Sequence, residues 1–153
     1  MRPLAAAPIL SLFSSCALFS RPVEVDHPHI EHPSGVEYED LVLGVGRTAR
    51  RGREITVDYV AYLEDGARFD SSFDRGVPLT FVLGEAPLAG WDKGIPGMRE
   101  GGRRRLFLPP RLAYGRGGVP GLVPPDAALV FDIDLLDVAV PGRDAGGGPG
   151  PPD

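Results

Sequence analysis

Apolar and polar side chains alternate through the middle of the chain, which predicts β-strands there. The clearest run is 54–63, where β-branched and aromatic residues occupy every second position. The same alternation returns at 128–138, near the end of the chain. Shorter runs of this kind lie at 36–43, 68–70, 79–83 and 104–108. The sum predicts a sheet of about five strands.

The segment 86–101 carries the three- and four-residue apolar spacing that is typical of a helix. Its apolar positions are Leu88, Trp91, Ile95 and Met98. Pro96 and Gly97 limit the helix to about two turns, because neither residue continues a helix well. One short helix cannot cover both faces of a sheet, so we expect an α+β fold with an antiparallel sheet wrapped around the helix.

Glycine and proline mark the connections between these elements. The pair Asp65-Gly66 predicts a hairpin turn after the strand at 54–63, since this dipeptide accepts positive φ. The segment 71–76 has no periodicity and is predicted to be an irregular loop. The segment 114–125 is rich in glycine and proline and is predicted to be a long loop.

Composition confines the folded domain to the middle of the chain. Glycine and proline contribute 21 and 17 of the 153 residues, and they are concentrated in loops and near the C-terminus. The tail 140–153 cannot bury enough apolar surface to offset its ordering entropy, so we expect it to be disordered. The segment 35–139 is long enough to build a small core.

The first twenty residues resemble an export signal, with a positive charge at Arg2 followed by apolar and small residues and no acid. This stretch is too short and too interrupted for a comfortable transmembrane helix. The residues before Cys16 resemble a bacterial lipoprotein processing site, in which the cysteine becomes lipidated, although Phe13 stands where leucine is usual. A lipoprotein signal, an ordinary secretion signal and neither of the two remain as alternatives.

The expected location depends on that choice. With a signal, the protein is exported and is either periplasmic or a membrane-anchored lipoprotein, held only through a lipid on Cys16. Without a signal in residues 1–20, it is cytoplasmic.

Residues 21–34 are predicted to form a linker, because three prolines disfavour both helix and central strand. The histidines of the chain, His27, His29 and His32, all lie here. Imidazole is a common metal ligand, but the stretch offers no cysteine partner and no rigid element. We therefore interpret it as solvated and expect no metal site.

The formal net charge of −5 is ordinary for a soluble protein and argues against nucleic acid as a partner. We interpret the short basic run Arg47, Arg50, Arg51 and Arg53 as a solvated loop. A second run, 103–105, consists of three consecutive arginines at the start of a predicted strand. We interpret this second run as a solvent-facing edge.

An ordered series of short motifs resembles the FKBP domain, with family spacing over about residues 34–139. The motifs are Val57-Asp58-Tyr59, Leu63-Glu64-Asp65-Gly66, Phe69-Asp70-Ser71-Ser72, Phe81-Val82-Leu83-Gly84, Gly90-Trp91-Asp92-Lys93-Gly94, Met98-Arg99-Glu100-Gly101-Gly102, Leu108-Pro109-Pro110, Ala113-Tyr114-Gly115, Leu122-Val123-Pro124-Pro125 and Leu129-Val130-Phe131. The resemblance implies a half-barrel antiparallel sheet curled around one short helix.

The same resemblance implies a peptidyl-prolyl cis/trans isomerase that uses no cofactor and works in a hydrophobic cleft between helix and sheet. Its implied partners are proline-containing polypeptide clients and macrolide inhibitors. The implied catalytic residues are Tyr59, Asp70, Trp91, Tyr114 and Phe131, and the implied substrate-binding residues are Phe69, Phe81, Leu88, Val119, Leu122 and Val123.

The chemistry explains why aromatic residues would carry such a site. Rotation about an X–Pro amide must overcome about 18–20 kcal/mol of resonance energy but breaks no bond, so it requires no nucleophile or metal. An apolar pocket favours the twisted amide, since the planar and more polar form loses more on desolvation. By resemblance, Trp91 forms the floor, the Leu88 N–H and the Tyr114 hydroxyl hold the carbonyl, and Asp70 orients the Tyr59 hydroxyl. Catalysis is then differential binding of the twisted form.

Other interpretations remain. Without the resemblance, the aromatic residues would be interpreted as an ordinary core, and the same pocket would serve a non-catalytic binding module or chaperone that holds proline-containing segments. The segment 115–127 leaves no room for an inserted domain, and we expect a monomer. Leu79, Pro87 and Val119 depart from the family pattern, which puts substrate preference, macrolide affinity and turnover in question more than the activity itself.

Overall fold

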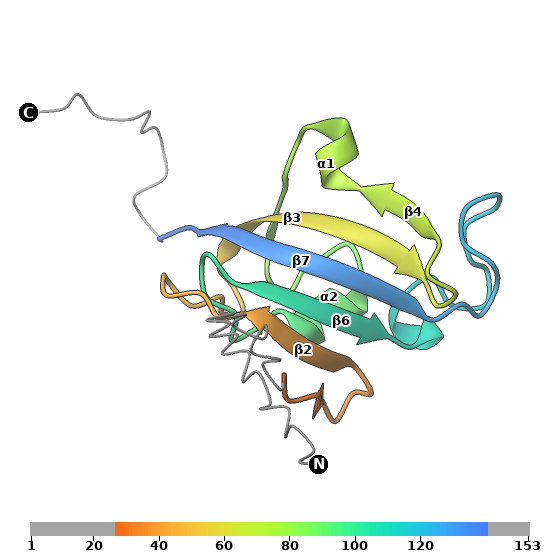
Figure 1. Ribbon diagram of the computed structural model, residues 1–153, viewed down its shortest axis with the longest axis horizontal. Helices are drawn as coiled ribbons and strands as arrows, with labels where there is room; N and C mark the ends of the chain where they lie inside the picture. Colours follow the sequence, from red (N-terminus) through yellow and green to blue (C-terminus); the bar gives the residue numbers. More distant parts are fainter. Residues whose placement is uncertain (1–26, 141–153) are drawn as a thin grey trace, which may run out of the picture.

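A seven-stranded antiparallel sheet runs through the computed structural model, which describes residues 27–140 (Figure 1). The strand order is β1-β2-β6-β7-β3-β4, with β5 also paired to β3, and the sheet does not close. The strands are β1 (Ile30–Glu31), β2 (Glu37–Val42), β3 (Glu54–Leu63), β4 (Arg68–Ser71), β5 (Leu79–Val82), β6 (Arg103–Leu108) and β7 (Leu129–Val138). The helices are α1 (Ser72–Arg75), α2 (Ala89–Gly94) and a 3-10 turn at Pro110–Leu112. The predicted α+β fold is confirmed.

The two long strands form the centre of the sheet and carry the predicted alternation. β3 and β7 pair along their whole length, with Tyr59 opposite Ile133 and Ala61 opposite Phe131. Burial alternates with a period of two in both strands, because successive side chains point to opposite faces. The apolar set therefore gathers on one face, which becomes the core.

Helix α2 lies against this inner face beside β6 (Figure 1). Its buried residues are Gly90, Trp91 and Gly94. A Cβ atom at Gly90 would overlap the Leu108 side chain, and one at Gly94 would lie 2.7 Å from Leu106 Cδ2. The two glycines, one helical turn apart, let the helix backbone approach β6 closely.

The helix is shorter than the predicted segment 86–101. Leu88 is its N-cap in an extended conformation, and the helix proper ends at Gly94. Pro96 and Gly97 follow, and Gly97 has a positive φ of 92° that ends any helical continuation. Ile95 and Met98 are still buried, so the apolar spacing extends beyond the helix itself.

Two segments contain more regular structure than expected. The segment 71–76, predicted to be an irregular loop, contains the single helical turn α1, which Gly76 terminates in the left-handed conformation. The predicted linker contributes β1, which pairs two residues with β2 at the edge of the sheet. Prolines on either side, Pro28 and Pro33, keep this strand short.

The histidine segment is attached to the sheet edge. The ring of His29 hydrogen-bonds Glu37 and Glu39 of β2, and these bonds raise its pKa above the ordinary 6.5. Within residues 27–140, no group of three or more histidine, cysteine or acidic side chains is arranged to hold a metal ion. Nor does any helix of that range have the length and apolar character needed to cross a membrane. Cys16, the signal-like segment 1–20, the start of the linker and the tail 141–153 lie outside the described residues.

We expect Gly90→Ala to lower the free energy of unfolding by about 1–3 kcal/mol, because the added methyl group forces α2 away from β6. Urea denaturation measures this change. Gly117→Ala is the matched control, since its Cβ would meet no atom within 4 Å and should alter stability by less than about 0.5 kcal/mol. Equal stability of the two variants would show that close helix–sheet approach is not required.

Candidate active site

A cluster of aromatic rings surrounds Trp91 where α2 meets the sheet. The Trp91 ring lies 5.1 Å from Tyr59 and 5.3 Å from Phe131, both edge-to-face, and 5.7 Å from Phe81. Phe69 extends the cluster through Phe131, with ring centroids 6.4 Å apart. We call these five residues the aromatic cluster.

Each ring reaches the cluster from a different element. Tyr59 on β3 and Phe131 on β7 point to the same face, and the small Ala61 opposite Phe131 leaves room between them. Phe81 comes from β5, and Phe69 comes from β4. Trp91 is only 2% exposed and belongs to the core, while Phe69 and Phe81 are half-buried at the edge of the cluster. Edge-to-face pairs of this kind add about 0.5–1.5 kcal/mol each beyond area burial.

A polar network covers one side of the cluster. The Tyr59 hydroxyl donates to Asp70 Oδ2 at 2.7 Å, and Arg75 Nη2 donates to the same hydroxyl at 2.6 Å. Arg75 Nη1 also pairs with Asp70 Oδ1, which accepts the Ser71 N–H at 2.8 Å. The guanidinium carbon lies 5.5 Å from the Tyr59 ring centroid. The phenol and the carboxylate are therefore each held by two or more partners.

This network sets the ionisation of its members. Burial raises the pKa of Asp70, but the hydrogen bonds from Tyr59 and Arg75 outweigh it, so the pKa lies below the ordinary 3.8. Burial, and then the hydrogen bond to Asp70, raise the pKa of Tyr59 above 10.0. At neutral pH the carboxylate is charged and the phenol is protonated.

Arg75 is the member of this network that the sequence analysis missed. It lies in the segment predicted to be an irregular loop, and only the helical turn α1 brings it back over Tyr59. The sequence does contain a signal for this turn. Arg75 lies five residues after Asp70, and Gly76, a residue type that often terminates a helical turn, follows it directly.

The long loop between β6 and β7 forms the other side of the site. Val119 and Val123 form an isolated bridge; Val123 is buried in the core, and Val119 is half-buried against it. Leu122 is 47% exposed and Tyr114 is 40% exposed. Burial, and then the charge of Asp70, raise the pKa of Tyr114, which places its hydroxyl in the field of that carboxylate.

Thus the structure joins six of the eleven predicted site residues in one cluster. Tyr59, Asp70, Trp91 and Phe131 are in mutual contact or one residue apart, with Phe69 and Phe81 beside them. Tyr114 and Leu122 stand outside the buried cluster. Leu88 is buried as the N-cap of α2, three residues before Trp91. Within residues 27–140, neither the Leu88 N–H nor the Tyr114 hydroxyl forms a hydrogen bond.

The indole N–H of Trp91 is buried without a hydrogen-bond acceptor among the described residues. An unpaired buried donor of this kind costs about 1–3 kcal/mol. Phenylalanine would fill most of the same space without that cost, so packing alone does not explain a tryptophan at this position.

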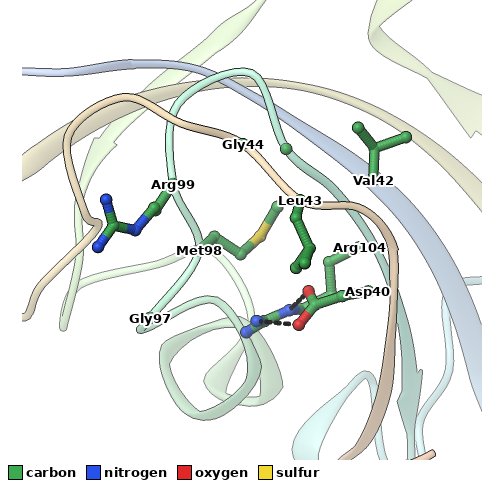
Figure 2. A pocket seen from close by; sticks show the side chains of 9 residues that line it. Asp40, Val42, Leu43, Gly44, Gly97, Met98, Arg99 and Arg104 are labelled. Atoms are coloured by element: carbon green, nitrogen blue, oxygen red, sulfur yellow. Dashed lines mark hydrogen bonds and ion pairs between the residues drawn. The ribbon is translucent and has the colours of Figure 1, made fainter. Parts of the chain in front are cut away.

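A separate pocket of about 180 Å³ is lined in part by the segment that follows α2 (Figure 2). It shares no residue with the aromatic cluster or its polar network. Its lining residues are Asp40, Val42, Leu43, Gly44, Gly97, Met98, Arg99, Gly102 and Arg104. Two of the lining residues, Asp40 and Arg104, form an ion pair.

Known proteins are similar to this chain in both fold and sequence. A family model described as FKBP-type peptidyl-prolyl cis-trans isomerase matches residues 45–136. An FK506-binding protein of Neisseria meningitidis serogroup B is 49% identical over 105 residues, which cover 68% of this chain and 96% of that protein. The crystal structure of AtFKBP13 is similar with a TM-score of 0.68 and 42% identity, over 73% of this chain and 99% of that chain.

A longer relative is similar over one part only. The peptidyl-prolyl cis-trans isomerase FkpA of Escherichia coli K12 is 42% identical over 105 residues. The match covers 69% of this chain but 38% of FkpA, so the similarity concerns only part of that protein.

We expect Arg75→Met to raise the pKa of Asp70, because it removes a hydrogen bond and a positive charge that favour the carboxylate. Because the pKa of Asp70 is lower in the folded than in the unfolded chain, its ionised form stabilises the fold above the unfolded pKa, and this contribution is lost as pH falls through the folded pKa. In the variant the folded pKa lies closer to the unfolded one, so the contribution should be smaller and its loss should be complete at a higher pH. NMR titration of the Asp70 carboxyl carbon measures the pKa. Arg68→Met, whose arginine pairs with Asp74 instead, is the control. An unchanged Asp70 pKa in Arg75→Met would mean that Tyr59 and Ser71 alone set it.

Proposed function

The chain belongs to the FKBP-type peptidyl-prolyl cis-trans isomerases, and from that premise we propose that the aromatic cluster around Trp91 is where an X–Pro bond is turned. Its enzyme class is that of its family, a peptidyl-prolyl isomerase. The observation that carries the proposal about the site is the joint presence of the buried rings and the Tyr59–Asp70–Arg75 network in one place.

The proline ring of the substrate packs against the cluster. Its apolar surface suits the half-buried rings of Phe69 and Phe81 at the rim, with Trp91 beneath them. Desolvation there penalises the planar amide more than the twisted one, because the planar form is more polar. The pocket therefore lowers the barrier of about 18–20 kcal/mol by binding the twisted form better.

Two free donors suit the carbonyl groups of the bound peptide. The Leu88 N–H and the Tyr114 hydroxyl find no acceptor within residues 27–140, and a peptide carbonyl would satisfy either one. Asp70 and Arg75 keep the Tyr59 hydroxyl fixed, so that the wall of the pocket does not move as the amide turns. The chemistry breaks no bond, and these residues contribute placement and electrostatics alone.

The unpaired Trp91 Nε1 supports a functional reason for the tryptophan. Its cost is retained although a phenylalanine would avoid it. The large flat ring offers more contact area to a proline ring than phenylalanine does.

The alternative function is a binding module that holds proline-containing segments in the same site without turning them. Both functions use the aromatic cluster, but only the isomerase accelerates cis/trans exchange of an X–Pro bond. An isomerisation assay therefore distinguishes them. Leu79, Pro87 and Val119, which depart from the family pattern, bear on substrate preference and macrolide affinity.

We expect the wild-type protein to accelerate cis/trans exchange of a short X–Pro peptide, and Asp70→Val to lower kcat/KM by about 10- to 100-fold through a misplaced Tyr59. A protease-coupled assay measures the rates. Asp74→Val is the control, because Asp74 is exposed on α1 and pairs only with Arg68. If the wild-type protein does not raise the isomerisation rate above background, the binding-module function is favoured instead. If Asp70→Val has the wild-type kcat/KM, Asp70 does not contribute to catalysis.

We also propose that the enzyme acts as a monomer on exported or envelope proteins, with a signal in the segment 1–20 that is cleaved before Cys16 and with Cys16 as the lipidated N-terminus of the mature chain. The signal-like composition and the small residues before Cys16 support this location. The loop 114–125 leaves no room for an inserted domain, and its residues Val119 and Val123 pack on the same domain, which supports a monomer.

Protein purified from its native host should have the mass of a chain that begins at a lipid-modified Cys16, and light scattering should give the mass of one chain. An unmodified Cys16 preceded by Met1 would overturn the signal. An unlipidated chain cleaved elsewhere would indicate ordinary secretion, and a stable dimer would contradict the monomer.

A further inference from the structure

Three consecutive arginines of β6 each form an ion pair with an aspartate on a neighbouring strand. Arg103 pairs with Asp134 and Arg105 pairs with Asp132, both on β7 and both on the outer face of the sheet. Arg104 pairs with Asp40 of β2, and it is 5% exposed. The predicted solvent-facing edge was therefore wrong for Arg104, because β6 lies inside the sheet and the alternation turns the middle arginine inward.

The guanidinium of Arg104 uses nearly all of its donors. Nε and Nη2 bind the two carboxylate oxygens of Asp40 at 2.5 and 2.9 Å (Figure 2). Nη1 donates to the carbonyl oxygens of Gly94 at 2.8 Å and Pro96 at 3.3 Å. Its central carbon also lies 4.1 Å from the Tyr38 ring centroid. One planar group thus joins β6, β2 and the end of helix α2.

Helix α2 depends on such external contacts. It has six residues, and a helix of that length leaves most of its terminal carbonyls without partners inside the helix. Arg104 satisfies Gly94 at the C-terminus, where a cation is also favoured by the helix dipole. Asp92, the residue directly after Trp91, accepts the N–H groups of Gly84 at 2.7 Å and Ala86 at 3.2 Å and so ties the helix to the segment that precedes it. Both attachments lie within three residues after Trp91.

We propose that Arg104, oriented by Asp40, is a positioning residue for Trp91 and so sets the depth and tilt of the proline-binding floor. Its hydrogen bonds go to Asp40, Gly94 and Pro96 and to no residue of the aromatic cluster, so it acts on Trp91 through the Gly94 and Pro96 carbonyls. The inference rests on the proposed function of the cluster. Lysine does not replace arginine here, because one ammonium cannot bind both carboxylate oxygens and two carbonyls in fixed planar geometry.

The test compares Arg104→Lys with Arg105→Lys. Arg105 is the matched control because it lies in the same strand and binds Asp132 through the same two atoms, Nε at 2.7 Å and Nη2 at 2.9 Å, yet touches nothing in α2. Asp40→Asn and its counterpart Asp132→Asn form a second pair that leaves each arginine in place. Rates are corrected for the folded fraction from urea denaturation.

Two readouts separate positioning from general stability. Trp91 is the only tryptophan of the 153 residues, so fluorescence emission and acrylamide quenching report its surroundings directly. We expect Arg104→Lys to shift the emission to longer wavelength and to lower kcat by about 10- to 100-fold with little change in KM, since a displaced floor weakens the twisted state while the rim still binds peptide. Asp40→Asn should change both readouts in the same direction by less. Arg105→Lys and Asp132→Asn should change neither.

Equal kcat per folded molecule and equal Trp91 emission in Arg104→Lys and Arg105→Lys would overturn the proposal. If Arg104→Lys does not fold, Asp40→Asn decides it alone, and wild-type kcat and emission in that variant would overturn it. A wild-type protein without isomerase activity would instead defeat the proposed function, and the emission of the four variants would still show whether Arg104 holds Trp91.

Discussion

The distance between helix α2 and the sheet governs the rest of this structure. Gly90 and Gly94 allow the helix backbone to reach the side chains of β6, and that approach brings Trp91 within edge-to-face distance of Tyr59 and Phe131. A helix set farther out would leave a void around the indole, and the domain would lose its central contacts. The same short distance makes the tryptophan a floor on which rings from β3, β4, β5 and β7 can converge.

Polar groups fix the orientation of the side chains and of the helix that the apolar contacts bring together. Around the site, Asp70 and Arg75 hold the Tyr59 hydroxyl, so the wall of the cluster has one orientation. Behind the helix, Arg104 holds the Gly94 carbonyl and is itself held by Asp40. Both networks use an arginine with an aspartate, because a planar fork and a carboxylate together define direction as well as distance. The reaction moves no proton and breaks no bond, so rigidity of this kind is what the protein can contribute.

Periodicity and motif order predicted the parts of the fold that are encoded locally. The alternation in β3 and β7 and the apolar spacing around Trp91 follow from which side chains must be buried, and the structure agrees with them. Arg75 was missed because its role depends on a one-turn helix that has no periodicity of its own. Arg104 was misplaced because three arginines in a row read as solvent-exposed, and only the position of β6 between β2 and β7 turns the middle one inward. β1 was missed because two residues at an edge carry too little pattern.

The strand order has a consequence for how the chain acquires its structure. β7, the last strand in sequence, lies between β6 and β3 and pairs with both of them along its length. Neither half of the sheet can bury its inner face until this strand arrives. The domain therefore cannot be completed until β7 has been synthesised, and its completion depends on largely non-local pairing, which is of the kind that folds slowly. Until β7 pairs, the apolar residues of β3 and the indole of Trp91 remain exposed to solvent. The isomerase itself therefore passes through an incompletely folded state with exposed apolar surface before it can act on other chains.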